Sequence, residues 1–568
     1  MVDAPTKGLK PWRQVILPHD DVAAGRFNVA EFAADLELVR TGDPQTAPEY
    51  RDPIPFFERT YLTHGLRDLL RDGLRRIAGL GGQPVYNCQT NFGGGKTHSL
   101  IALYHLFSGV QAADLPPEAR AVVEAEVTEI PAVRRAVVVG NRFGAGEVHV
   151  KPDGTEVNTL WGEIAWQLGD AAGDGAAGYA IVASSDQHRT NPGDKLRELF
   201  QRYAPCLVLI DEWVAYAREL YGADPLPGGS FDTQFGFAQA LTESARAVDG
   251  VLLVVSIPAS ESPDQEREAG AATAAEPVVS DLEVGGVGGR EALRRLTHVV
   301  SRQAEHWQPA TGDESFEIVR RRMFHPLDPE REAARDEVAE AFGEHYRRQR
   351  SEFPPECAEH RYVERIKAAY PIHPEVFDRL YREWSTVDRF QRTRGVLRLM
   401  AAVIHALWAS DDQSPLILPC SIPIDEPKVE SELTSKLDDH WRPVIAADVD
   451  GAGSRPAIID REVPNLGRVH ATRRVARTIF LGAAPTLRSP NRGIEVERIR
   501  LGSCFPNDAV ALFGDALNRL ADQAPHLYVD RSRYWFDVQE NINRTARDDA
   551  DRLLDGPRDE VHTEIVDR

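Results

Sequence analysis

Apolar residues along this chain follow two periods, one typical of helices and one typical of buried strands. Residues 54–79 carry leucine and isoleucine at helical spacing and end at Gly79. From residue 84 onward, strand-like runs alternate with helical stretches; the runs are 84–89, 135–139, 206–210 and 251–257, and the stretches are 96–107, 158–168 and 235–248. Continuous apolar runs separated by helices are typical of a parallel sheet covered on both faces. The pattern therefore predicts an α/β core.

The pattern changes after the last of these strands. Residues 259–289 are rich in Ala, Gly, Glu and Ser and lack any period, which predicts a mobile loop or insertion. The next part reads as mostly helical, and a helix over 507–522 precedes LYVDRSRYWFDV, which predicts two short strands round a tight turn. We therefore expect four parts: a helical N-terminal segment (1–80), an α/β core (81–310), a helical lid (311–410) and a mixed, winged-helix-like region (411–568).

Composition narrows the class of protein. The 568 residues are 42% hydrophobic and 27% charged, as in globular proteins, and no apolar run approaches the roughly 20 residues that a bilayer requires. The N-terminus lacks the apolar run of a signal peptide, and the five cysteines form no C-x-x-C pair, so we expect a soluble, cytoplasmic protein. A net charge of −22 disfavours attraction of the whole molecule to nucleic acid but leaves room for a local basic face.

The stretch QTNFGGGKTHS (89–99) lies between the first predicted strand and an apolar helix. It ends like the phosphate-binding loop G-x-x-x-x-G-K-[ST], in which backbone N–H groups and the next helix N-terminus bind phosphates, the lysine reaches the β/γ oxygens and the threonine holds Mg²⁺. The predicted nucleotide contacts are Asn91, Phe92, Gly93, Gly94, Gly95, Lys96, Thr97 and His98. Thr90 stands where such loops have their first glycine, which costs backbone freedom. His98 can instead be a helix residue that faces a neighbouring strand.

A second motif follows downstream. The run CLVLIDEW (206–213) ends an apolar strand in Asp211 and Glu212. In P-loop ATPases the aspartate at this point coordinates the Mg²⁺ shell and the glutamate polarises the attacking water. An acidic pair after an apolar run is common by itself, but here it lies on a separate strand of the same predicted sheet as the loop. We predict a site for ATP and Mg²⁺, with the metal held through Thr97 and Asp211 and with Glu212 as the base.

The order of elements after the acidic motif resembles that of AAA+ ATPases, which place a polar residue at the end of a strand between the two motifs. The resemblance implies this role for Ser256, with Ser260 second. The stretch SRQAEHWQPATGDESFEIVRRRMF is similar to the initiator branch of AAA+ proteins and implies Arg302 as the arginine that reaches a neighbouring subunit's γ-phosphate. The stretch FQRTRGVLRLM is similar to the second sensor motif of that branch and implies Arg398, then Arg394. The alternative for Ser256 is a serine that merely ends a strand, and the alternative for the arginines is a position on a solvent-exposed helix surface.

Several strings together resemble one family: FFERTYLTHGLRDLL, NFGGGKTH, TLWGEIAWQL, LIDEWVAYAR, EIVRRRMF, YPIHPE, FQRTRGVLRLM and RYWF. They look like the PglY-like P-loop ATPases of bacterial phage-exclusion (BREX) and phage-growth-limitation islands. The resemblance implies an ATPase in anti-phage defence, beside a DNA methyltransferase and an alkaline-phosphatase-like partner. Such proteins usually run longer, and the sequence leaves open whether this chain is a fragment of a longer protein.

These observations predict an ATP hydrolase that forms homo-oligomers, because an arginine acting in trans requires self-association. Two alternatives remain: a nucleotide-gated scaffold with little turnover, and a DNA helicase or translocase motor. Candidate contacts to DNA phosphates are Arg473, Arg474, Arg477, Arg531 and Arg533, although arginines in an acidic chain also pair with local carboxylates. We interpret His373, between two prolines, as a structural turn residue.

Overall fold

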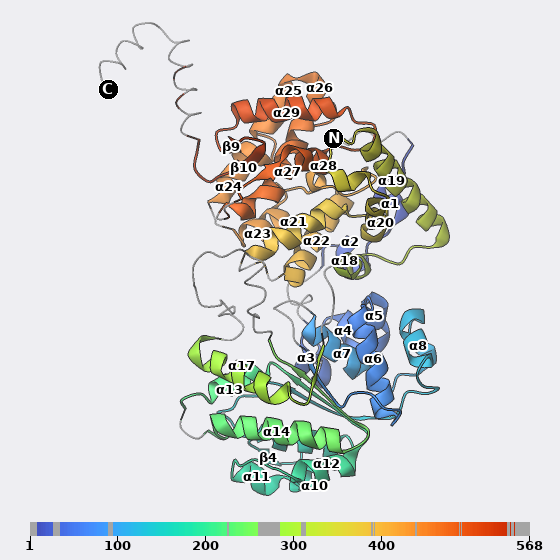
Figure 1. The fold of residues 1–568 in the computed structure, drawn as a ribbon, viewed down its shortest axis with the longest axis vertical. Coiled ribbons are helices and arrows are strands. Elements are labelled where there is room, and N and C mark those ends of the chain that lie inside the picture. The colour runs from blue at the N-terminus through green and yellow to red at the C-terminus, as the bar shows by residue number, and fades with distance from the viewer. Residues whose placement is uncertain are drawn as a thin grey trace, which may run out of the picture. The chain divides into compact units, whose positions relative to one another are not determined.

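The chain forms two compact units in the computed structural model (Figure 1). The α/β unit comprises Asn28–Ser315, and the helical unit combines Met1–Phe27 with Phe316–Arg568. The structure describes residues 8–26, 34–88, 95–223, 226–258, 285–307, 314–387, 390, 392–437, 440–487, 489, 491–541, 546 and 550. The segment predicted over 1–80 thus contributes to both units, and most of the predicted insertion, 259–284, lies outside the described residues.

A parallel sheet forms the centre of the α/β unit. Its strand order is β2 (Arg134–Val139), β5 (Cys206–Asp211), β6 (Val251–Ser256), β1 (Val85–Cys88), with the short β7 (Glu305–Trp307) at the edge beside β1. The first four are the strands that the apolar runs predict, and the prediction of a parallel sheet is confirmed. Because every pairing is parallel, the carboxyl ends of the strands meet at one edge.

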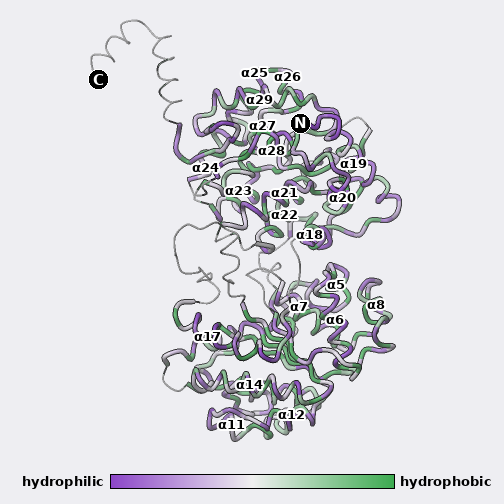
Figure 2. Tube along the Cα trace, viewed as in Figure 1, coloured by the Kyte–Doolittle hydropathy of each residue, from purple (hydrophilic) through white to green (hydrophobic). Residues whose placement is uncertain are grey.

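Helices cover both faces of this sheet, as the continuous apolar runs predict. One hydrophobic core joins alternate strand residues to α6 and α7, and the other joins the intervening residues to α9, α12, α13, α14 and α17. Figure 2 shows the hydrophobic residues concentrated along the strands. The helices of the unit are α3 (Leu36–Thr41), α4 (Pro48–Arg51), α5 (Pro53–Arg59), α6 (His64–Ile77), α7 (Lys96–Leu106), α8 (Pro117–Glu124), α9 (Leu160–Asp170), α10 (Gly175–Ala180), α11 (Ala183–Gln187), α12 (Lys195–Tyr203), α13 (Trp213–Glu219), α14 (Phe231–Ala247) and α17 (Gly286–Val300).

Local sequence signals set several helix starts. The predicted helical stretch 54–79 forms two helices, because Thr63 caps α6 and accepts a hydrogen bond from the backbone N–H of Leu66 at 3.1 Å. Thr159 caps α9 in the same way. Asp186, which is fully buried, accepts hydrogen bonds from the backbone of Asn158 and Thr159 and from other donors, so it fixes the start of α9 in place. A small hairpin of β3 (His149–Val150) and β4 (Glu156–Val157) precedes this helix.

The helical unit contains the predicted helices of the central part of the chain. Its helices are α1 (Trp12–Val15), α2 (Asp20–Ala23), α18 (Ser315–Met323), α19 (Pro329–Arg348), α20 (His360–Ala369), α21 (Pro374–Arg382), α22 (Arg392–Ala409), α23 (Pro427–Thr434), α24 (Trp441–Val444), α25 (Arg455–Glu462) and α26 (Pro464–Gly467), followed by the C-terminal elements. Trp12 is fully buried here, with ring contacts to Phe324 and Trp408 and a hydrogen bond from its indole N–H to Asp412. The first helices of the chain therefore belong to the core of this unit.

The C-terminal elements combine three helices with a small antiparallel sheet. They follow in the order α27 (Ala471–Ala483), β8 (Ile494–Glu495), α28 (Val496–Ser503), α29 (Val510–Gln523), β9 (Leu527–Asp530) and β10 (Arg533–Phe536), and the strand order is β8-β10-β9. The predicted pair of short strands after a helix is confirmed as the hairpin β9–β10. Across the described parts of the chain, no helix is both long and apolar enough to cross a membrane.

Candidate functional site at the carboxyl edge of the parallel sheet

The glycine-rich stretch connects the end of β1 to the start of α7. Residues 89–94 lie outside the described residues, and with them the predicted contacts Asn91, Phe92, Gly93 and Gly94. Gly95 caps α7 with φ 84° and ψ 16°, a left-handed conformation that glycine adopts without strain. Lys96 is the first residue of the helix and is 7% exposed. The helix therefore begins at the point where a phosphate-binding loop requires it.

Thr97 and Asp211 are 114 residues apart in the chain and adjacent in space. The Thr97 hydroxyl donates a hydrogen bond to Oδ2 of Asp211 at 2.7 Å. Asp211 is the last residue of β5, is 2% exposed, and accepts a second hydrogen bond through Oδ1 from the backbone N–H of Glu212 at 3.1 Å. The two predicted metal-binding side chains thus lie together at the carboxyl edge of the sheet.

Glu212 follows Asp211 in a left-handed conformation with φ 54°, at the N-terminal cap of α13. The end of β2 approaches this turn closely: the backbone N–H of Gly140 donates to the carbonyl of Asp211 at 2.8 Å. A Cβ atom at Gly140 would lie 2.2 Å from the carbonyl oxygen of Glu212, so only glycine fits there. Sequence reasoning missed Gly140, although a glycine directly after the apolar run RAVVV is the signal that could have found it.

Charges from both motifs act on Cys88, the last residue of β1. Burial raises the pKa of its thiol; the charge of Lys96 works against this shift and that of Asp211 adds to it. The buried thiol therefore lies within electrostatic reach of the lysine from the loop and of the aspartate from β5.

Ser256 is the last residue of β6 and is buried. It stands opposite Cys88 in the sheet register, and β6 lies between β1 and β5, as the AAA+ resemblance implies. The strand order thus brings Ser256 to the same edge as Asp211. Its role at a reacting water stays a prediction, and the second candidate, Ser260, lies outside the described residues.

His98 turns from the sheet edge toward α5. Its ring centroid lies 4.7 Å from that of Phe56, and its Nε2 is 3.1 Å from the hydroxyl of Thr60. The alternative to a nucleotide contact is a helix residue that faces a neighbouring strand. In the structure the His98 ring instead packs against the aromatic ring of Phe56. A contact between His98 and nucleotide stays a prediction.

The two predicted arginines of the AAA+ resemblance lie in different units. Arg302 follows α17 in the α/β unit, is exposed, and approaches Nε2 of His298 at 2.6 Å. Arg398 lies on α22 of the helical unit, where its guanidinium donates to Glu432 at 2.8 Å. Exposure of Arg302 suits a group that acts on another subunit, whereas Arg398 is engaged within its own unit.

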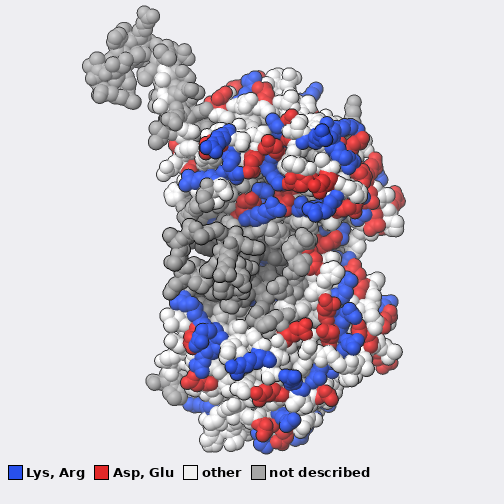
Figure 3. All heavy atoms as spheres, in the orientation of Figure 1, with Lys and Arg blue, Asp and Glu red and all other residues white. Residues whose placement is uncertain are grey.

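The arginines of α27, which are candidate DNA contacts, pair with carboxylates inside the helical unit. Arg477 contacts Asp450 at 2.7 Å and Arg473 contacts Asp425 at 2.9 Å; Arg474 pairs with Asp508, and Arg533 of the hairpin with Glu495. Figure 3 shows basic and acidic side chains interspersed over each unit on the face drawn. The four arginines with carboxylate partners therefore follow the alternative interpretation, in which they form local ion pairs. The fifth candidate, Arg531, is exposed.

His373 has the structural role that its flanking prolines predict. It caps α21, where its Nδ1 accepts a hydrogen bond from the backbone N–H of Glu375 at 3.1 Å, and its Nε2 lies 3.0 Å from the hydroxyl of Tyr346. Burial lowers the pKa of His373 to about 3, so the ring is neutral at physiological pH.

Two family models match the chain in succession. The DUF499 N-terminal domain matches residues 13–282, which include both halves of the candidate site, and the DUF499 second domain matches residues 310–492. Neither description names an activity. No curated protein matches the chain. The chain is therefore similar to the N-terminal domain and the second domain of the DUF499 family, one after the other.

Proposed function

We propose that the α/β unit binds ATP with Mg²⁺ and hydrolyses it. The observation that carries the proposal is the 2.7 Å hydrogen bond between Thr97 and Asp211. A threonine directly after a glycine-rich lysine loop and an aspartate at the end of a neighbouring strand are the two groups that hold Mg²⁺ in P-loop ATPases. Two motifs found separately in the sequence converge on one point.

The residues present fit the metal and the nucleotide. Thr97 and Asp211 supply hard oxygen ligands or hydrogen bonds to metal-bound water, which Mg²⁺ prefers. Lys96 and the N-terminus of α7 supply positive charge for the phosphates. When bound, Mg²⁺ neutralises charge on the phosphate oxygens.

Glu212 is the proposed base, because it follows Asp211 at the edge where the strands end. The left-handed turn, held against Gly140, sets the direction of its side chain relative to Asp211. A carboxylate there accepts a proton from the attacking water. Ser256, on the strand between the two motifs, is the proposed second contact to that water, and Arg398 is the proposed sensor in the lid.

Oligomer formation is part of the proposal. Arg302 is exposed at the end of α17, and a planar guanidinium stabilises the charge that spreads over a transferring phosphoryl group. We propose that it acts on ATP bound to a neighbouring copy of the chain. The specific ATPase activity should then rise with protein concentration in the parent and stay low in Arg302→Ala.

The cellular role rests on the motif resemblance to PglY-like ATPases of BREX and phage-growth-limitation islands. We propose that ATP hydrolysis serves anti-phage defence, in contact with a DNA methyltransferase or a phosphatase-like partner. The order of helices and strands over 471–536 supports a winged-helix-like element in this assembly. Since the arginines of α27 are engaged in ion pairs, a protein partner suits this element better than DNA does.

Hydrolysis and binding measured on the same variants test the proposal. We expect Lys96→Ala to lose ATP binding, and Glu212→Gln to bind ATP while losing most turnover, whereas Glu198→Gln, an exposed glutamate on α12, should match the parent. Undiminished hydrolysis in Glu212→Gln would refute the base assignment. ATP binding by the parent with no turnover at any concentration would favour the nucleotide-gated scaffold instead.

A further inference from the structure

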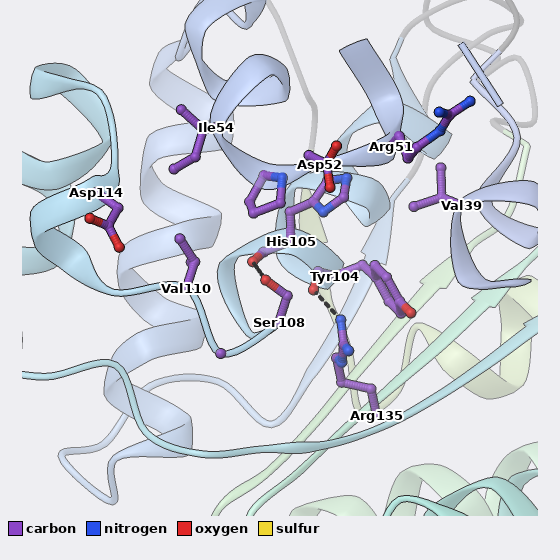
Figure 4. Close-up of a pocket in the computed structure, with 12 residues that line it drawn as sticks. Val39, Arg51, Asp52, Ile54, Tyr104, His105, Ser108, Val110, Asp114 and Arg135 are labelled. Carbon is purple, nitrogen blue, oxygen red and sulfur yellow. Dashed lines mark hydrogen bonds between the residues drawn. The ribbon is translucent and has the colours of Figure 1, made fainter. Parts of the chain in front are cut away.

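A pocket of about 700 Å³ lies in the α/β unit at the end of α7 remote from Lys96 (Figure 4). Its walls come from α3, from the junction of α4 and α5, from the last turn of α7 with the residues after it, and from the first residues of β2. Because β2 contributes Arg135, near its amino end, the pocket lies at the opposite edge of the sheet from Asp211. It is therefore separate from the proposed nucleotide site.

Arg135 is the main charged group of this pocket. Its guanidinium stacks over the ring of Tyr104 at 4.0 Å and donates to the carbonyl oxygen of Tyr104 at 2.8 Å, a contact drawn in Figure 4. Burial lowers its pKa. Within the described ranges no carboxylate forms an ion pair with it, so one backbone carbonyl and one ring face a half-buried positive charge. A cation that is partly shielded from water attracts anions strongly, so this position suits the acid group of a bound molecule.

A second arginine adds to the positive charge. Arg51 donates to the carbonyl oxygens of Pro44 and Thr46, both at 3.1 Å, and it too forms no ion pair with a carboxylate of the described chain. His105 contributes no charge, because burial lowers its pKa to about 4 and its Nε2 lies 2.9 Å from the carbonyl oxygen of Tyr50.

Two carboxylates lie elsewhere on the pocket wall. In Figure 4, Asp114 lies across the pocket from Arg51, and Asp52 lies above Tyr104 and His105. Apolar side chains such as Ile54 and Val110 line the wall on the side of Asp114. The pocket wall thus carries positive charge from Arg51 and Arg135 and hydrogen-bond acceptors from Asp52 and Asp114.

We propose that this pocket binds a small phosphorylated or carboxylated molecule whose other end carries hydroxyl or amino groups. Arg135 and Arg51 hold the acid group, since guanidinium groups match the oxygens of phosphate and carboxylate. Asp114 accepts hydrogen bonds from the donors at the far end. The volume is within the range of ordinary small-molecule sites.

Calorimetric titration of the full chain with ribose 5-phosphate and with ribose tests this site. The experiment is done in the Lys96→Ala background, which removes the main phosphate contact of the proposed nucleotide site. We expect saturable binding of ribose 5-phosphate and none of ribose. In Arg135→Gln the affinity should fall about tenfold or more, because one charge-assisted contact is lost. Arg202→Gln is the matched control: Arg202 also lies over a tyrosine ring, that of Tyr203, but outside the pocket.

Arg51→Gln and Asp114→Asn provide independent readings if Arg135→Gln folds poorly, since both side chains lie at the pocket rim. Each should weaken ribose 5-phosphate binding, and Arg202→Gln should leave it unchanged. Absence of saturable binding up to millimolar concentration overturns the proposal. Equal affinity in the background protein and in the folded Arg135→Gln and Arg51→Gln variants also overturns it.

Discussion

Thr97→Val removes one hydroxyl and keeps the shape of the side chain, so it isolates the hydrogen bond to Asp211. The two oxygens are 2.7 Å apart and the carboxylate is 2% exposed, so the bond is charge-assisted and poorly screened by water. Such a bond contributes about 1.5–3 kcal/mol, and each 1.4 kcal/mol or so is a factor of ten in affinity. If the Thr97 hydroxyl makes a contact of similar strength to Mg²⁺ or its bound water in the complex with ATP, Thr97→Val removes that contact and should weaken Mg-ATP binding about 10- to 100-fold.

Asp211→Asn is the second variant of a double-mutant cycle with Thr97→Val. Asparagine removes the charge of the carboxylate and keeps the shape of the side chain. Two groups that act on one ion do not contribute independently. We therefore expect the double variant to bind Mg-ATP about as weakly as the weaker single variant, rather than with the product of the two losses.

The assay is titration with a fluorescent ATP analogue, in Mg²⁺ and in excess chelator. Thr242→Val serves as the control, because this buried hydroxyl donates only to backbone carbonyls within α14. Its affinity should equal that of the parent. Losses at Thr97 and Asp211 that multiply, or that persist unchanged in chelator, would show that the two side chains do not share an ion.

Three further variants test parts of the fold. Asp186→Ala, which removes the acceptor of the Thr159 backbone N–H and of the Tyr179 hydroxyl, should destabilise the protein by about 3–5 kcal/mol, read as an earlier denaturation midpoint. Gly140→Ala should reduce turnover more than ATP binding, because its Cβ would displace Glu212; Gly146→Ala, with no atom within 4 Å, should not. The hydrogen bond that protonated Nδ1 of His526 donates to Asp448 raises the pKa of His526, so the stability it contributes is present below about pH 6.5 and is lost as pH rises through the raised value. The melting-temperature difference between the parent and His526→Ala should shrink accordingly from about pH 6 to 9.

The sheet could be predicted from sequence because its strands are uninterrupted apolar runs. The segment Val251–Ser256 is apolar up to its last residue. It forms β6, the expected strand, which lies between β5 and β1. The edge strand Glu305–Trp307 could not be predicted, since three residues of mixed polarity carry no period. In the same way, the two-residue strand Ile494–Glu495 adds to the predicted hairpin through pairing that only the folded chain reveals.

The residues of the candidate site could be predicted from the sequence where they belong to a local sequence motif. The pairing of Thr97 with Asp211 follows from two local patterns, each of which names its own residue. Gly140 and the pocket around Arg135 follow from no local pattern, because segments distant in sequence form them. Trp12 illustrates the same limit, since its partners lie more than 300 residues away.

The burial of Trp12 has a consequence for synthesis of the chain. Its ring partner Trp408 leaves the ribosome roughly 20 to 80 s later, at about 5–20 residues per second. Until this interval ends, the indole lacks its partner Trp408, although every described residue of the parallel sheet is made before Trp408. The helix that begins at this tryptophan, α1, thus reaches its native environment only after the residues of the parallel sheet have been synthesised.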